Sequence, residues 1–184
     1  MQILFLDPIQ TAVLDVVAWI AIHLSLGYLS SKIPLAQLDP NRRFFQAFAW
    51  EKNGEIYQKL FGVKYWKHFM PNGSALYPGA FSIRRLVSFD PAYLEVWLQE
   101  SVRAETCHWA MIFPGVFFFL WNSVAGGWGM VAYAVLNNVV PIILQRFNRP
   151  RVRRLLARLQ MESSQKGAVD VVNAPPQALS HSYG

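Results

Sequence analysis

The residues with the clearest chemical potential lie in the segment Arg103-Ala-Glu-Thr-Cys-His-Trp109. On a helix, Glu105 and His108 are three residues apart and therefore share a face. A histidine oriented by a carboxylate at a water–lipid boundary can act as a general base toward a hydroxyl group. The alternative is a structural ion pair or hydrogen bond at the start of a helix, which is the commoner use of an isolated Glu-x-x-His pair. His68, in Trp66-Lys67-His68, is the second candidate base.

A dense basic cluster, Gln145-Arg-Phe-Asn-Arg-Pro-Arg151, directly follows the last apolar stretch of the chain. Guanidinium groups bind phosphates through charge-assisted, often bidentate hydrogen bonds. We therefore expect Arg146, Arg149 and Arg151 to hold a lipid phosphate or the phosphates of an acyl donor such as acyl-CoA. The alternative is a purely topological anchor, because basic residues commonly flank membrane helices on the cytoplasmic side.

Further polar residues occur inside the apolar stretches themselves. Asp15 and His23 lie within the first stretch, and Asn137 and Asn138 lie within the third. Ionisable groups are costly inside a membrane and for that reason point to a function. The two asparagines raise the same question more weakly.

These residues must be positioned by helices, because the composition and its distribution are those of a membrane protein. The 184 residues are 53% apolar and only 15% charged, where an ordinary soluble domain has about 25% charged residues. Three stretches carry much of the excess: Ile9–Leu29, Trp109–Trp121 and Gly129–Leu144. A span needs about 20 apolar residues. We expect an all-α membrane protein with about three membrane-embedded helices, one over residues 9–29 and a hairpin over 104–144, for which a re-entrant hairpin is the alternative.

The positive charges favour one orientation of these helices. All 17 Lys and Arg residues fall between Lys32 and Arg103 or between Arg146 and Lys166. The positive-inside rule then places residues 30–103 and the C-terminal tail in the cytoplasm, with the N-terminus and the hairpin tip outside. The net charge of +6 fits anionic lipid headgroups, and no nucleic-acid partner is expected.

The segment 30–103 interleaves aromatic and basic residues, as amphipathic helices at a membrane interface do. Asp90-Pro91 predicts a helix start, with Asp at the N-cap and Pro at the first position. The apolar residues that follow at three- and four-residue spacing predict a helix along the membrane surface that bends near His108. Residues 1–160 form one membrane domain in this interpretation, and 161–184 a disordered tail.

Several segments, taken in order, resemble one family of enzymes. They are Lys32-Ile-Pro34, Phe48-Ala-Trp-Glu-Lys-Asn-Gly54, Lys59-Leu-Phe-Gly-Val-Lys-Tyr-Trp-Lys-His68, Arg103–Trp109 and Asn138–Arg151. Over about residues 30–160 the chain resembles the glycosyl-4,4'-diaponeurosporenoate acyltransferases. The resemblance implies transfer of a fatty acyl group to a sugar hydroxyl of a carotenoid glycoside or similar glycolipid, without a bound cofactor or metal. Expected substrate-binding residues are Trp66, Lys67, Arg103, Gln145, Arg146, Asn148, Arg149 and Arg151.

The sequence lacks the motifs of four other enzyme classes. The His-x4-Asp arrangement of glycerolipid acyltransferases is missing, since the Asp position, five residues after the His, holds Phe113 for His108 and Gly73 for His68. There is no GxSxG elbow, P-loop or Rossmann fingerprint. A rival hypothesis of another class is a non-catalytic small subunit of a larger membrane complex, in which seven Trp and thirteen Phe contact lipid or pigment.

Overall fold

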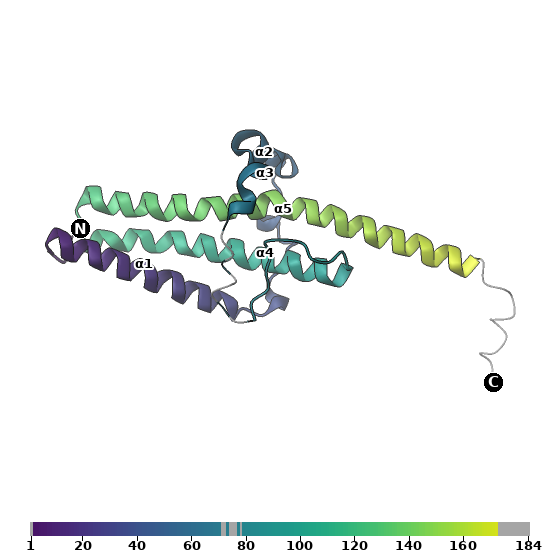
Figure 1. Ribbon diagram of the computed structural model, residues 1–184, viewed down its shortest axis with the longest axis horizontal. Coiled ribbons are helices and arrows are strands. Elements are labelled where there is room, and N and C mark those ends of the chain that lie inside the picture. The colour runs from purple at the N-terminus through teal and green to yellow at the C-terminus, as the bar shows by residue number, and fades with distance from the viewer. Residues whose placement is uncertain (1, 71–72, 74–76, 78, 173–184) are drawn as a thin grey trace.

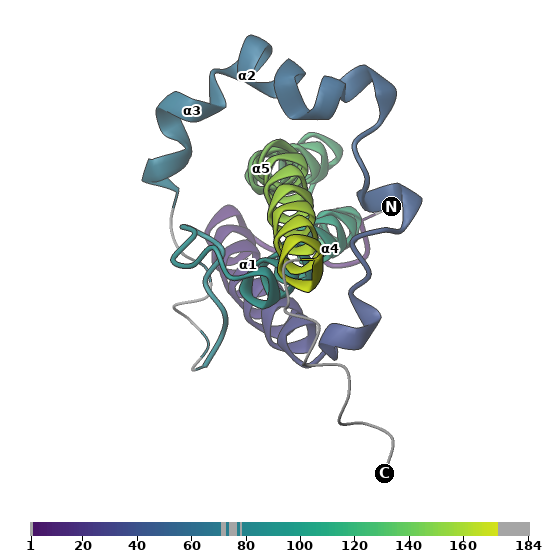
Figure 2. The same cartoon turned by 90° about the vertical axis from the view of Figure 1, so that its right-hand side faces the viewer.

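Three long helical rods lie side by side in the computed structural model, which describes residues 2–70, 73, 77 and 79–172. They are α1 (Pro8–Ser31), α4 (Pro91–Ile112) continued by η6 (Phe113–Leu120), and α5 (Val124–Val172). The segment between α1 and α4 holds short helices: η1 (Leu35–Gln37), η2 (Arg43–Phe45), η3 (Ala49–Gly54), α2 (Glu55–Phe61), α3 (Val63–Trp66) and η4 (Lys67–Phe69). Figures 1 and 2 show α2 and α3 lying over one side of α5. The predicted all-helical class is confirmed.

Within the described residues, two helices are long and apolar enough to cross a membrane: α1, with a mean hydropathy of 1.8 over its most apolar part, and α5, with 1.5. Helix α1 begins cleanly because the Asp7 carboxylate accepts hydrogen bonds from the backbone N–H groups of Ile9 and Gln10, both at 2.9 Å, and Pro8 suits the first helical position. The expected number of about three membrane-embedded helices is not confirmed, since α4 is not among the helices that meet this criterion within the described residues.

Helix α4 begins at Pro91 with Asp90 at its N-cap, as the sequence predicted. The predicted bend near His108 is wrong, because α4 continues through that residue to Ile112. The helix tightens to a 3-10 helix only at Phe113, next to Pro114, which cannot donate a backbone hydrogen bond. A turn over residues 121–123 then reverses the chain into α5.

The first half of α4, which the sequence suggested would lie along a membrane surface, packs against the C-terminal half of α5. Leu94, Trp97 and Leu98 form a buried core with Val152 of α5, so the apolar face of α4 is covered by protein. Helix α5 continues to Val172, and residues 161–172 are therefore helical where a disordered tail was expected. The rest of that expected tail, 173–184, lies outside the described residues.

The opposite end of the bundle is held by a second core and by Asp15. Trp19 of α1 stacks on Phe118 of η6 with ring centroids 4.5 Å apart. The Asp15 carboxylate accepts hydrogen bonds from Trp121 Nε1 at 2.7 Å and Asn122 Nδ2 at 2.8 Å. This acidic residue within the first apolar stretch thus binds α1 to the hairpin tip, which accounts for its presence there.

Candidate functional site

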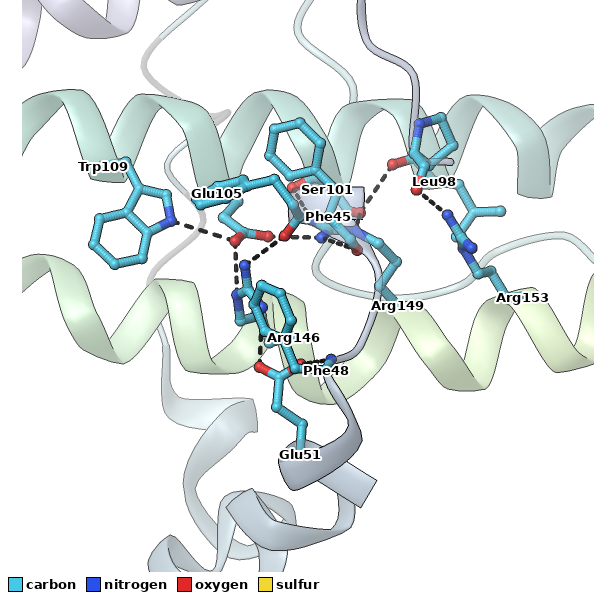
Figure 3. A network of polar contacts seen from close by, with 12 residues as sticks. Phe45, Phe48, Glu51, Leu98, Ser101, Glu105, Trp109, Arg146, Arg149 and Arg153 are labelled. Atoms are coloured by element: carbon cyan, nitrogen blue, oxygen red, sulfur yellow. Dashed lines mark hydrogen bonds and ion pairs between the residues drawn. The ribbon is translucent and has the colours of Figure 1, made fainter. Parts of the chain in front are cut away.

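A buried ion-pair network of Glu51, Glu105, Arg146 and Arg149 joins η3, α4 and α5 (Figure 3). Glu105 is fully buried and accepts from Arg146 Nε at 2.8 Å and from Arg149 Nη1 at 2.6 Å. Glu51, also fully buried, accepts from Arg146 Nη1 at 3.0 Å. Two carboxylates therefore balance two guanidinium groups, as burial of charge requires.

The remaining donors of the two arginines are bonded inside the protein as well. Arg146 Nη2 donates to the Phe44 carbonyl at 2.7 Å and Arg149 Nη1 to the Phe45 carbonyl at 3.0 Å. Arg149 also donates to the Ser101 hydroxyl at 2.7 Å and to the Ser101 carbonyl at 2.8 Å. Arg146 and Arg149, which the sequence suggested as phosphate ligands, are thus occupied by protein acceptors. Their role in this structure is to fasten residues 44–51 to the two long helices.

Glu51 is aimed at Arg146 by an unusual local backbone. Lys52, Asn53 and Gly54 all have positive φ, at 47°, 55° and 83°, which reverses the chain directly after Glu51. A Cβ at Gly54 would lie 2.9 Å from the Arg146 carbonyl oxygen. That carbonyl is the one Pro150 cannot satisfy, since proline lacks the N–H that would bond four residues back. Only a glycine allows the loop to approach α5 so closely.

Tyr57 completes the surroundings of Glu51. Its hydroxyl donates to Glu51 Oε1, and the Phe48 backbone N–H donates to Oε2 at 2.7 Å. Burial, followed by the hydrogen bond to Glu51, raises the pKa of Tyr57 well above its usual range. Residue spacing did not single out Glu51 as a member of the network, because its partner Arg146 lies 95 residues further along the chain. The turn signal at Asn53-Gly54 was the only local sign.

His108 is oriented by an amide rather than by Glu105. Its Nδ1 lies 2.8 Å from Asn138 Oδ1 on α5, and the Asn138 amide nitrogen donates to the Ala134 carbonyl at 2.8 Å. Oδ1 therefore accepts, so Nδ1 carries the proton and Nε2 keeps its lone pair. Glu105 pairs with Arg146 and Arg149 instead of with His108 as expected, because the two guanidinium groups attract its carboxylate toward α5.

A second histidine–asparagine contact lies next to the first. His23 Nδ1 donates to the Trp19 carbonyl at 2.7 Å, and its Nε2 faces the Asn137 amide nitrogen at 3.4 Å. Consecutive asparagines of α5 therefore meet a histidine of α1 and a histidine of α4. Three of the four polar residues that stood out within the apolar stretches, His23, Asn137 and Asn138, thus take part in these two contacts, whereas Asp15 bonds to the hairpin tip.

Lys67 of η4 and Arg151 of α5 both lie beside the ring of Phe147, and these two positively charged side chains are called the cation pair. The Lys67 ammonium lies 5.6 Å from the Phe147 ring centroid and the Arg151 guanidinium 3.6 Å from it. Partial burial, then the positive charges of Arg151 and Lys64, lower the pKa of Lys67. Within the described part of the chain neither cation makes an ion pair with a carboxylate. The positive charge of this pair is therefore suited to binding an anion.

The other residues singled out from the sequence are dispersed. Arg103 donates to the carbonyls of Ser30 and Ile33 and pairs with Glu100, which fixes the end of α1 to α4. His68 is exposed on η4 with its ring against Phe69. The remaining three are Trp66, packed at the Tyr57–Phe147 core, Gln145, buried with an unbonded Oε1 among the described residues, and Asn148, which is half-buried.

Fold and site together define a small helical, membrane-associated protein whose polar groups gather where its long helices meet. Comparison with known proteins adds the family. The family model for glycosyl-4,4'-diaponeurosporenoate acyltransferase matches residues 41–158, and the chain belongs to this family of acyltransferases. A relative of that name from Staphylococcus aureus strain N315 is 33% identical over 152 residues, covering 83% of this chain and 92% of the relative. The relative from strain MRSA252 is 32% identical with the same coverage. No solved structure matches the chain.

Proposed function

We propose that this protein transfers a fatty acyl group to a sugar hydroxyl of a carotenoid glycoside or similar membrane glycolipid, with His108 as the general base. The observation that carries the proposal is the hydrogen bond from His108 Nδ1 to Asn138 at 2.8 Å, which leaves Nε2 as a proton acceptor. The names of the relatives support the acyl transfer and the kind of acceptor. The general-base role rests on geometry alone.

In the proposed reaction, His108 Nε2 takes the proton of the acceptor hydroxyl as its oxygen attacks the acyl carbonyl carbon. The bond between that carbon and the donor's leaving group then breaks, and the imidazolium returns its proton to the leaving group. An ester forms and one donor ester or thioester is consumed. Asn138 holds the ring through Nδ1 during both proton transfers, as a base-orienting group does in other acyl-transfer sites.

The position of the site along the long helices suits a reaction between membrane lipids. Arg146 is 22 residues after the start of α5, or about 33 Å along the helix, which is comparable to the roughly 30 Å hydrocarbon core. The buried ion-pair network thus falls near a membrane boundary, and Asn138 lies about 12 Å closer to the hairpin tip. His108 would then meet an acyl carbonyl below the headgroups. The positive charges favour a cytoplasmic location for residues 30–103 and 146–184.

The cation pair Lys67–Arg151 is the proposed site for the anionic part of the acyl donor, either the phosphates of acyl-CoA or a lipid phosphate. An anion placed there would relieve the repulsion between the two cations. Arg146 and Arg149 are not part of this proposal, because protein carboxylates and carbonyls already use their donors.

The test is acyl transfer by the purified chain in mild detergent, supplied with a labelled acyl donor and a glycosylated carotenoid acid. We expect the label to appear on the sugar. A protein that copurifies with a stoichiometric membrane partner and transfers no label alone would contradict the proposal and favour the non-catalytic subunit.

A further inference from the structure

A groove of about 580 Å³ lies between α1 and α5. Its walls include Val16, Trp19, Ile20 and His23 of α1, and Tyr133 and Asn137 of α5. The groove exists because α1 packs mainly on α4 and stands away from α5 along this stretch. Its volume is in the range of small-molecule and lipid sites.

The lining is apolar except at its two ends. At one end, Asp15 already accepts hydrogen bonds from Trp121 and Asn122. At the other end, the exposed Asn137 amide has, among the described residues, a single polar side-chain contact, the 3.4 Å one with His23. An exposed amide inside a membrane-spanning helix is costly unless something polar reaches it. That end of the groove is therefore suited to a ligand with a hydrogen-bond acceptor.

The length of the groove favours one kind of lipid. From Asp15 to Leu24 the α1 helix rises by about 13.5 Å, which is less than half of the roughly 30 Å hydrocarbon core. A flexible acyl chain can bend to fit such a groove. A rigid polyene that crosses both leaflets would extend far beyond it.

We propose that this groove binds the fatty acyl chain that is transferred, with the acyl carbonyl accepting a hydrogen bond from the Asn137 amide. The assignment of the chain as the transferred one rests on the proposed function. Asn137 precedes Asn138, which orients His108, so a carbonyl held at Asn137 is placed at the same level of α5 as the proposed base. The groove then positions the acyl group, while the carotenoid acceptor approaches from outside it.

The test uses a fatty acyl ester that carries a photoactivatable group in its tail, with the purified protein in lipid nanodiscs. Val16→Trp fills the groove, and Val17→Trp is the matched control, because Val16 and Val17 are 58% and 56% exposed and Val17 lies outside the lining. We expect Val16→Trp to reduce labelling of peptides 15–24 and 130–137 about tenfold, a loss of about 1.4 kcal/mol in binding. Val17→Trp should change it by less than about twofold, which corresponds to about 0.4 kcal/mol.

A second variant tests the polar end. Asn137→Leu should weaken binding of the acyl ester, yet leave binding of a tail-labelled alkane without a carbonyl unchanged. Equal labelling in both Trp variants, or competition by a C30 polyene but not by a fatty acyl ester, would overturn the groove assignment. If Val16→Trp and Asn137→Leu change labelling as expected but the wild-type protein has no transferase activity, the groove assignment stands and the proposed function is rejected.

Discussion

Asn138 of α5 accepts a 2.8 Å hydrogen bond from His108 of α4, across the interface between these two helices. The amide cannot ionise, so it fixes the imidazole tautomer without adding a charge beside it. A carboxylate in the same place would also stabilise the protonated ring. In this protein the carboxylate of Glu105 is used for another purpose, the neutralisation of two buried arginines.

Replacement of Glu105 by Gln should destabilise the protein strongly. The change leaves Arg146 and Arg149 with only Glu51 to balance them, and loss of one partner of a buried ion pair costs about 3–5 kcal/mol. Thermal unfolding in detergent measures the effect. Glu95→Gln, on the exposed face of α4, is the control and should change stability by less than about 0.5 kcal/mol. Similar unfolding of both variants would contradict the structural role of the network.

Gly54→Ala should cost about 1–3 kcal/mol of stability, because alanine is strained at a φ of +83° and its Cβ would press on the Arg146 carbonyl oxygen. Gly79→Ala is the matched control, since Gly79 also has a positive φ, of 77°, but open space around it. The difference between the two variants measures the close approach of the loop to α5. Equal losses would show that backbone strain alone matters.

Lys67→Ala and Arg151→Ala should each raise the KM for a phosphate-bearing acyl donor with little change in kcat. A hydrogen bond to a charged group contributes about 1.5–3 kcal/mol, so the expected increase is about ten- to a hundredfold. Lys59→Ala, which removes an exposed charge on α2, controls for net charge. An unchanged KM in both variants would mean that the cation pair is only a membrane anchor.

Cysteine accessibility should report the orientation that the positive charges favour. In a Cys107→Ala background, Ser123→Cys at the hairpin tip should react with an impermeant reagent added to whole cells. Ser163→Cys, near the end of α5, should react only after permeabilisation. The reverse pattern would contradict the positive-inside assignment of residues 30–103 and 146–184.

Local signals in the sequence predicted much of the fold. Asp90-Pro91 marked the start of α4, and the apolar stretches marked the rods. The partner of an apolar face carries no local signal, so the face of α4 that packs on α5 at Trp97 was mistaken for a membrane-facing one. Headgroup insertion and core packing require the same three- and four-residue spacing.

The candidate site was predictable as a set of residues but not as a set of pairs. Glu105, His108 and Arg149 all stood out by type and by their place beside the apolar stretches. Which groups bond depends on the register of α4 against α5, which no spacing within one helix reveals. That register brings Glu105 to the arginines and His108 to Asn138.

The catalytic role of His108 is tested by the rate of acyl transfer of His108→Ala, at protein levels matched to wild type. Loss of a general base reduces the rate about a hundred- to ten-thousandfold, and we expect a loss of that size. His68→Ala, which alters an exposed histidine, should keep near-wild-type activity. A His108→Ala protein that transfers acyl groups within a few-fold of the wild-type rate would contradict the account.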